Sequence, residues 1–245
     1  MGLPSPEGRV IVQSWNIQAG GGTRMTAILA SIARHAADTV VLAETTTTRL
    51  GELTAGLRSL GFASFHAPEP PARKRGILLA SKRPFVPRDV SATRRVEPHR
   101  WVEAWFPKER FGLAGIYFPD TAKPIQALWP RVHEAARRRR EEPFLLVGDL
   151  NSGHGAFDTE GAELSSEPWF TAMPYHGMTD LWRHKHRDVR EYTWYSNHTG
   201  RHRGFRLDHA FGTASLRRRV RTIWYSHDER LAGTSDHSPL LLSLR

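Results

Sequence analysis

The chain has 245 residues, of which 39% are hydrophobic, and its eight Trp and eleven Phe suffice for the core of one large α/β domain. It contains no cysteine, which excludes disulfides, thiol catalysis and zinc–thiolate sites. The formal net charge of +10 favours a polyanionic partner, nucleic acid before a membrane surface, although an arginine excess also serves as solubilising charge.

Neither end of the chain nor its interior predicts a membrane segment. Residues 1–7 lack a basic stretch followed by an apolar run, so no signal peptide is expected. The apolar runs have the length of strands and are too short to cross a bilayer. We therefore expect a cytoplasmic monomer, associated with the nucleoid if its source is bacterial.

Strands and helices alternate in the first half of the chain. Hydrophobic runs predict strands at 9–15, 39–43, 62–66, 76–81, 100–106 and 111–118. The helical period predicts one helix capped by Thr23 and ending near Ala36, and a second over 49–60. A third is expected over 125–140, where Pro130 must lie in the first turns or kink the helix.

Strands dominate the second half. A strand is expected at 144–147, then an irregular region over 152–190 with short helices near Pro168 and Asp180. Further strands are expected at 192–196, 205–211, 220–225 and 239–244. No repeat or low-complexity linker divides the chain, so 1–245 is predicted to form a single domain with mixed sheets and outer helices, a two-sheet α/β sandwich.

Polar residues recur where these strands begin or end. Gly148-Asp149-Leu150-Asn151 follows one apolar strand, and Ser235-Asp236-His237-Ser238-Pro239 precedes the last. Either cluster alone is compatible with a turn. Because further polar residues stand at other strand ends, sheets packed face to face would bring them to one cleft: Asn16, Glu44, Tyr117 and Asp208. Crowded carboxylates need a cation, which predicts metal-assisted phosphate chemistry.

The ordered set of motifs carries a family resemblance. It comprises Ser14-Trp15-Asn16, Ala43-Glu44-Thr45, Tyr117-Phe118-Pro119, Gly148-Asp149-Leu150-Asn151, Tyr192-Thr193-Trp194, Gly204-Phe205-Arg206-Leu207-Asp208 and Ser235-Asp236-His237-Ser238-Pro239. Together these resemble the endonuclease/exonuclease/phosphatase superfamily, and within it the exonuclease III-type apurinic/apyrimidinic (AP) endonucleases. The resemblance covers almost the whole chain. It implies a DNase I-like four-layer α/β sandwich, a mixed two-layered β-sandwich flanked by helices.

The resemblance also implies a metal site. Glu44 would be the main ligand of Mg²⁺, for which Mn²⁺ can substitute, with help from Asn16 and Asp236. Further candidate ligands in the same set are Asp149, Asn151 and His237. The metal would offset negative charge in the transition state of phosphate hydrolysis.

Catalytic roles follow from the same resemblance. Asp149 would align or deprotonate the attacking water, and Asn151 would hold that water or the phosphate. His237, oriented by Asp208, would contact the scissile phosphate. Tyr117 would donate a hydrogen bond to a phosphate oxygen, and a Tyr here is typical of exonuclease III-type enzymes, whereas DNase I has His.

A DNA-binding surface is expected beside these groups. Trp194, Phe205 and Leu207 stand where the AP endonucleases form an apolar pocket for a base-free sugar, although aromatic residues of this spacing are also common in a protein core. Contacts with DNA are also expected at His154 and Arg206. The implied activity is hydrolysis 5′ to abasic sites in duplex DNA, with trimming of 3′-blocked ends, in DNA repair.

Some residues depart from the family pattern. Gln18 stands where relatives often have Asp or Asn, Thr46 replaces a common Lys, and segment 120–123 lacks an Arg that inserts into DNA. These departures leave two alternatives open, a non-specific nuclease or phosphatase of the same superfamily, and a catalytically silent DNA-binding module. The intact set of acids and His237 argues against the second alternative.

Two other clusters of polar residues have simpler interpretations. The basic run 137–140 ends a predicted helix, where cations complement the helix dipole, and we expect a solvated helix end rather than a DNA contact. Four histidines without a helical pair or cysteines are expected at the surface or facing DNA rather than in a zinc site: His184, His186, His198 and His202.

Overall fold

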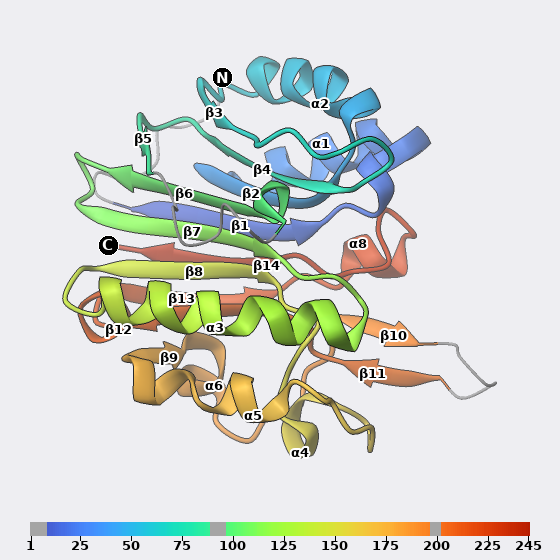
Figure 1. Ribbon diagram of the computed structural model, residues 1–245. Helices are drawn as coiled ribbons and strands as arrows, with labels where there is room; N and C mark the ends of the chain where they lie inside the picture. Colours follow the sequence, from blue (N-terminus) through green and yellow to red (C-terminus); the bar gives the residue numbers. More distant parts are fainter. Residues whose placement is uncertain (1–8, 89–96, 197–201) are drawn as a thin grey trace.

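Two mixed β-sheets of six strands each pack face to face at the centre of the molecule (Figure 1). The structure is a computed structural model that describes residues 9–88, 97–196 and 202–245; segment 1–7 and His198, both considered above, lie outside these ranges. In spatial order the first sheet contains β13 (Val220–Tyr225), β14 (Leu240–Leu244), β1 (Val10–Asn16), β2 (Thr39–Thr45), β4 (Gly76–Ser81) and β3 (Ser64–His66). The second contains β5 (Val86–Pro87), β6 (Trp101–Phe106), β7 (Phe111–Tyr117), β8 (Phe144–Asp149), β12 (Asp208–Thr213) and β9 (Met178–Asp180).

Helices cover the outer face of each sheet, so the molecule has four layers. Helices α1 (Met25–Arg34) and α2 (Thr47–Ser59) pack on the first sheet. Helices α3 (Ala122–Arg139) and α5 (Glu167–Thr171) pack on the second (Figure 1). The remaining helices are short: α4 (Gly155–Asp158), α6 (Leu181–His186), α7 (Ala214–Arg217), α8 (Asp228–Leu231) and the 3₁₀ segments Ala19–Arg24, Pro98–Arg100 and Met173–His176. The predicted four-layer α/β sandwich is therefore confirmed.

The central strands are apolar throughout because both of their faces are buried. In β2, Val41 and Ala43 point into the core between the sheets, whereas Val40 and Leu42 point toward the helices. Such doubly buried strands read as continuous hydrophobic runs rather than as alternating ones. This explains why the sequence located them well.

Each sheet contains one parallel strand pair joined by a helix. The pair β1–β2 is connected through α1 and the pair β7–β8 through α3, and antiparallel neighbours β14 and β12 flank them. The carboxyl ends of the parallel strands therefore lie beside the amino ends of their antiparallel neighbours. All these ends face the same edge of the sandwich, which is where the candidate site is found.

The structure corrects several local expectations. Thr23 does not cap α1, because it lies in the preceding 3₁₀ segment, and Arg24 is the N-cap. Pro130 lies inside α3 rather than in its first turns. The strand expected over 205–211 is two strands, because the chain turns inward at Arg206 between β11 (Arg203–Phe205) and β12. Strand β11 pairs with β10 (Trp194–Ser196) in a separate two-stranded ribbon.

Elements too short for a periodic pattern were missed altogether, namely β5, β9, α4, α7 and α8. The basic run at the end of α3 forms ion pairs with nearby carboxylates, such as that between Arg139 and Glu103 of β6 at 2.8 Å. Within the described ranges, no helix combines the length and apolar character needed to cross a membrane.

Candidate active site

The candidate site lies at the sandwich edge where the two parallel strand pairs end. Asn16 ends β1, and Glu44 is the penultimate residue of β2. Tyr117 and Asp149 end β7 and β8 and are register partners, and Asp208 at the start of β12 pairs with Asp149 from the other side. The fold thus brings together residues that are up to 192 positions apart in the chain.

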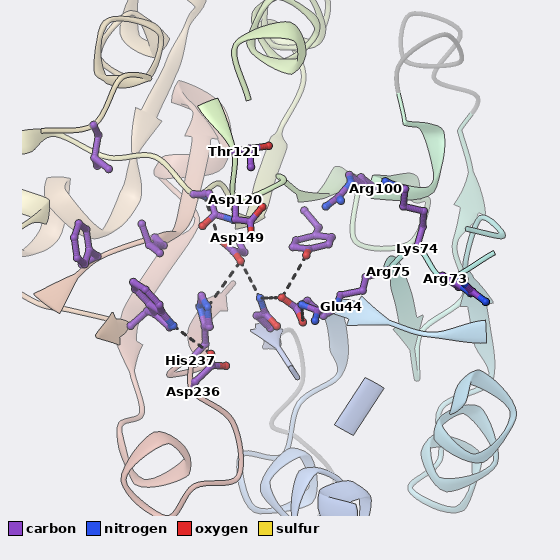
Figure 2. Close-up of a pocket in the computed structure, with 17 residues that line it drawn as sticks. Glu44, Arg73, Lys74, Arg75, Arg100, Asp120, Thr121, Asp149, Asp236 and His237 are labelled. Atoms are coloured by element: carbon purple, nitrogen blue, oxygen red, sulfur yellow. Dashed lines mark hydrogen bonds and ion pairs between the residues drawn. The ribbon is translucent and has the colours of Figure 1, made fainter. Parts of the chain in front are cut away.

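Apart from Asp208, which is fully buried, these residues open onto one cleft with a volume of about 830 Å³ (Figure 2). The sequence-predicted residues that line it are Asn16, Glu44, Tyr117, Asp149, Asn151, Trp194, Phe205, Leu207, Asp236 and His237. The lining also includes residues that the sequence analysis did not select: Arg73, Lys74, Arg75, Arg100, Asp120, Thr121 and Leu164. The predicted convergence of the strand ends is therefore present in the structure.

The backbone at Glu44 is held in a conformation that non-glycine residues rarely adopt. Its φ is 63°, and the register of β2 against β4 shifts at this point, which marks a β-bulge. A left-handed φ at a non-glycine residue costs about 1–3 kcal/mol and persists only where the surrounding structure enforces it. The bulge turns the Glu44 carboxylate toward the cleft, where its Oε1 accepts hydrogen bonds from Asn16 Nδ2 (3.2 Å) and the Tyr117 hydroxyl (3.3 Å).

Gly148 explains why the Gly-Asp-Leu-Asn motif begins with glycine. Its φ is 151°, and a Cβ there would lie 1.7 Å from the carbonyl oxygen of Ile116. Only glycine permits this close approach of β7 and β8. Three residues later Asn151 also has a positive φ of 41°, and its backbone N–H donates to Asp149 Oδ1 at 3.1 Å.

Asp149 lies at the centre of a buried hydrogen-bond chain. Its Oδ2 accepts from Asn16 Nδ2 at 2.9 Å and lies 4.0 Å from Nε2 of His237. On the other side of the ring, His237 Nδ1 lies 2.8 Å from Asp208 Oδ2, so Asp208 orients the imidazole as predicted. One nitrogen of His237 is thereby occupied by Asp208, and the other faces Asp149 and the cleft.

The electrostatics of this chain reflect two carboxylates that share one imidazole. Burial raises the pKa of Asp149 to about 7, and the charge of Asp208 adds to that rise. Burial alone would lower the pKa of His237, but the charges of Asp208 and Asp149 outweigh it and raise that pKa well above its ordinary value. Asp149 is therefore suited to exchange a proton near neutral pH, and His237 is suited to carry one.

Tyr117 is a neutral hydrogen-bond donor at this site. Burial raises the pKa of its hydroxyl to about 12, and the charges of Glu44 and Asp149 act in the same direction. The guanidinium of Arg100 lies 4.4 Å from the centre of its ring. The phenol therefore keeps its proton and can donate a hydrogen bond to an oxyanion in the cleft.

An apolar wall, formed by Trp194, Phe205 and Leu207, borders one side of the cleft. Trp194 and Phe205 are paired across the β10–β11 ribbon with ring centres 5.8 Å apart, and both are only half-buried. They are therefore not ordinary core aromatics, which was the alternative interpretation. Trp194 Nε1 also donates to Asp236 Oδ2 at 3.2 Å and so joins the wall to the acidic edge.

A cationic wall, formed by Arg73, Lys74, Arg75 and Arg100, borders the cleft on the side of Glu44, away from Asp236 and His237 (Figure 2). The guanidinium of Arg75 lies 2.5 Å from Glu44 Oε2. None of these four residues was among the predicted site residues. Three consecutive basic residues directly before the buried strand at 76–81 were the available signal, because a strand start beside the Glu44 strand faces the same edge.

The expectation that Arg206 contacts DNA is wrong. Its side chain is 1% exposed and forms ion pairs with Asp158 (2.8 Å) and Asp180 (2.6 Å). His154 does not line the cleft. It caps α4 by accepting from the Ala156 N–H at 3.2 Å, and since its side chain is 39% exposed, its contact with DNA stays a prediction.

The histidines considered for a zinc site are dispersed. His186 bonds to the Ile223 carbonyl at 2.9 Å and stacks on Trp182, so it is part of the packing rather than a surface group. His184 and His202 are exposed, as expected. No metal-ligand group among the described residues includes them.

The oxygen donors around Glu44 fit a hard divalent cation. Mg²⁺ prefers oxygen ligands and commonly keeps several waters beside one or two protein carboxylates. Glu44 and Asn16 offer such oxygens, and the Arg75 guanidinium already stands beside Glu44 as a cation. Asp149, Asp208 and His237 also lie within ligand distance of one another, but Nδ1 of His237 is already paired with Asp208 there. Glu44 is therefore the better anionic anchor for a metal.

Four layers with a polar cluster at one edge of the central sandwich define the DNase I-like fold. The chain belongs to the endonuclease/exonuclease/phosphatase family, whose model matches residues 14–237. This family comprises nucleases and phosphatases, so the chain falls in a class of hydrolases that act on phosphate esters.

Three solved structures share the fold. An AP endonuclease from Archaeoglobus fulgidus has a TM-score of 0.78 and 19% identity, covering 95% of this chain and 98% of its own. A 3′ phosphatase from Neisseria bound to a product DNA hairpin has a TM-score of 0.78 and 18% identity, covering 96% and 99%. A 3′-5′ exonuclease from Neisseria meningitidis has a TM-score of 0.77 and 19% identity, covering 96% and 99%. No curated protein matches the sequence significantly.

Proposed function

We propose that the protein is a Mg²⁺-dependent DNA phosphodiesterase that hydrolyses the backbone 5′ to abasic sites and trims blocked 3′ ends. The observation that carries this proposal is the convergence of Glu44, Asp149 and His237 on a cleft with an apolar wall. The similarity of the fold to an AP endonuclease and to a 3′ phosphatase supports it. The excess of positive charge suits a DNA partner, and the chain would act as a single catalytic domain.

A metal would be held by Glu44 with help from Asn16 and Asp236, and it would supply positive charge that offsets the charge developing on the phosphate. Mn²⁺, which accepts the same ligands, would substitute for Mg²⁺. Because Arg75 now neutralises Glu44, it would have to leave that carboxylate when the metal binds.

The side chains of this protein would divide the remaining work. Asp149 accepts a proton from the attacking water as its oxygen bonds to phosphorus, and Asn151 orients that water through the amide oxygen left free by its Nδ2 bond to the Phe118 carbonyl. The bond from phosphorus to the 3′ oxygen breaks, and that oxygen leaves as a hydroxyl. His237, held by Asp208, donates a hydrogen bond to the phosphate, as does the hydroxyl of Tyr117.

The apolar wall would supply lesion selectivity. Trp194, Phe205 and Leu207 can pack against an extruded sugar that carries no base. Extrusion costs least where the base is missing, so a pocket of this kind favours abasic duplex over intact duplex.

A cleavage assay tests this proposal on four substrates: abasic duplex, intact duplex, single-stranded DNA and RNA, each with Mg²⁺ and with EDTA. Incision of the abasic duplex in Mg²⁺ only, at a rate above that of the other three, is the expected result. Equal rates on all substrates would indicate the non-specific nuclease, and activity restricted to small phosphate esters would indicate a phosphatase. Binding of DNA without any hydrolysis would indicate the silent module.

A further inference from the structure

We propose that Arg75 is a specificity-determining residue that gives the site a preference for terminal phosphate monoesters of nucleic acids over internal diesters. This inference rests on the proposed function, because it requires a metal at Glu44. Arg75, which lies outside the sequence motifs, would distinguish phosphates by their charge and by their number of free oxygens.

The backbone at Arg75 is held by its neighbours, while its side chain is half-exposed at the cleft. The preceding residues form a turn in which Lys74 N–H donates to the Pro71 carbonyl at 2.9 Å, and the following Gly76 begins β4 with its backbone close against the carbonyl of His99. The Arg75 side chain is 48% exposed and reaches Glu44 across the mouth of the cleft. A fixed backbone that presents a half-exposed guanidinium to the cleft suits Arg75 for binding an anionic substrate.

The contact with Glu44 is one that a metal would replace. Glu44 Oε2 accepts from Arg75 at 2.5 Å and from the Ala19 N–H at 2.8 Å, and its Oε1 accepts from Asn16 and Tyr117. A divalent cation on this carboxylate is a stronger counter-charge than a half-exposed guanidinium, whose pairs contribute little in water. Arg75 would then be left beside the metal without its anion.

A neighbouring arginine already faces the cleft with spare donor capacity. Arg100 is 8% exposed and lines the cleft. Its Nε pairs with Glu97 Oε2 at 2.6 Å, and among the described residues its Nη1 has no hydrogen-bond partner. A buried, unsatisfied guanidinium nitrogen costs free energy unless an anion binds it. Once a metal holds Glu44, the positive charge of Arg75 is therefore in surplus on this side of the cleft, and Arg100 Nη1 adds a free donor beside it.

A terminal monoester matches this surplus better than a diester does. A phosphate monoester carries a charge of about −1.5 to −2 at neutral pH, whereas a diester carries one negative charge. The monoester also has three unesterified oxygens rather than two. After the metal, His237 and Tyr117 have taken their contacts, a monoester still presents an oxygen to the guanidinium, and a charge-assisted hydrogen bond of this kind is among the stronger ones in proteins.

The reaction with such a substrate balances without any further reactant. The oxygen of water bonds to phosphorus, and the bond from phosphorus to the sugar oxygen breaks. The sugar oxygen leaves as a hydroxyl with one proton, and inorganic phosphate is the second product. Arg75 takes no proton and stabilises only the charge of the phosphate.

Binding measurements in a slow background test this role separately from turnover. Full-length Asp149→Asn protein in Mg²⁺ is titrated with one labelled duplex that ends in a 3′-phosphate, a 5′-phosphate or hydroxyls only, and fluorescence anisotropy gives each Kd. The phosphate ends should bind more tightly than the hydroxyl end, and Arg75→Ala should reduce that preference roughly tenfold. The 3′ and 5′ arms identify which terminus enters the cleft.

Two further variants serve as controls. Arg73→Ala removes the same charge from the same turn, but the Arg73 guanidinium forms no ion pair with Glu44, so it should weaken all three duplexes by the same factor. Arg75→Lys keeps the charge without the planar fork and should retain part of the preference. Calorimetric titration of the proteins without DNA should show Mg²⁺ binding roughly two- to fivefold more tightly to Arg75→Ala, because a competing cation is gone.

The outcomes separate this inference from the proposed function. If the wild-type protein hydrolyses DNA in Mg²⁺ but Arg75→Ala weakens phosphate-ended and hydroxyl-ended duplexes equally, the role of Arg75 is refuted and the proposed function stands. An unchanged Mg²⁺ affinity in Arg75→Ala refutes the exchange at Glu44. If the wild-type protein hydrolyses neither diesters nor terminal phosphates, the proposed function itself fails.

Discussion

The molecule has two buried clusters in which two carboxylates surround one basic side chain. They are alike in composition, but their positive and negative charges are balanced differently. Asp149, Asp208 and His237 at the sandwich edge place two carboxylates around one imidazole. Asp158 and Asp180, beneath the β10–β11 ribbon, surround Arg206. Both clusters are shielded from water, yet the pKa of Asp149 is raised whereas the pKa values of Asp158 and Asp180 are lowered.

In the Arg206 cluster every charge is matched. Burial alone would raise the pKa of Asp158, but the guanidinium of Arg206 outweighs it and lowers that pKa, and the pKa of Asp180 is lowered in the same way. Arg183 adds a second cation at 2.7 Å from Asp158. This cluster is compensated internally, so it serves to fix the chain that carries Phe205 and Leu207.

In the Asp149 cluster negative charge is in surplus. The pKa of Asp149 is raised, and Asp208 Oδ1 has no hydrogen-bond partner among the described residues. The comparison teaches that a matched buried ion cluster indicates structure, whereas an unmatched one that opens on a cleft indicates chemistry that a substrate completes.

The largest effect is expected from Asp149→Asn. Removing the proton acceptor should lower the hydrolysis rate by about 10²–10⁴-fold, because general-base catalysis contributes on that order. DNA binding should be retained or tightened, since one negative charge near the phosphate is gone. Rate and Kd are measured on the same preparation, with the melting temperature as the control for folding. A folded variant with a wild-type rate would contradict the catalytic role.

Arg206→Met should have the opposite profile. Removing one partner of a buried ion cluster costs about 3–5 kcal/mol, because the remaining carboxylates are left uncompensated. Urea unfolding measures that loss, and the triple variant Arg206→Met, Asp158→Asn, Asp180→Asn should recover part of it. Well below the unfolding transition, each folded molecule should still hydrolyse DNA. Full stability together with weakened DNA binding would restore the discarded assignment of Arg206 to the DNA surface.

The sequence predicted the fold and most of the residues that the structure brings to the cleft, and the reasons are physical. Doubly buried strands such as β2 and β8 are continuous apolar runs, so the polar residues that end them stand out. Arg206 was misassigned because a basic residue within a motif next to Leu207 gives no local sign of burial, and its acids lie 48 and 26 positions away. Arg75 was missed because its importance comes from pairing with Glu44 across two antiparallel strands, which no single segment shows.

Phe205→Ala should have an intermediate effect that falls on selectivity. In the proposed function the half-buried ring packs against the extruded sugar, so its loss should reduce the preference for abasic over intact duplex roughly tenfold and leave Mg²⁺-dependent hydrolysis of intact DNA nearly unchanged. A core Phe would instead cost about 3–5 kcal/mol of stability. A large fall in melting temperature with an unchanged cleavage ratio would show that Phe205 is a packing residue.

The smallest expected effect is a difference in pH dependence between the two clusters. Asp158 has a folded pKa below its unfolded value of about 3.9, so it contributes stability above that pH and the contribution is lost as pH falls through the folded pKa. Asp149 has a folded pKa of about 7, so its contribution declines as pH rises from about 4 to 7.

Melting temperatures recorded in EDTA from about pH 4 to about pH 8 measure this difference. Asp149→Asn should remove the decline in melting temperature that the wild type shows between about pH 4 and 7. Asp158→Asn should lower the melting temperature at neutral pH. Parallel curves for the two variants would mean that the clusters do not differ in the way their geometry indicates.

The most direct test of the central claim compares wild type with Glu44→Gln on an abasic-site duplex, in Mg²⁺ and in EDTA. In the proposed function Glu44 is the anionic anchor for the metal, and its backbone is held in a left-handed conformation that would otherwise be costly. Incision by the wild type in Mg²⁺ alone, and a rate lower by orders of magnitude for a Glu44→Gln protein with an unchanged melting temperature, is the predicted result. Incision that persists in EDTA, or a wild-type rate for Glu44→Gln in Mg²⁺, would contradict the account.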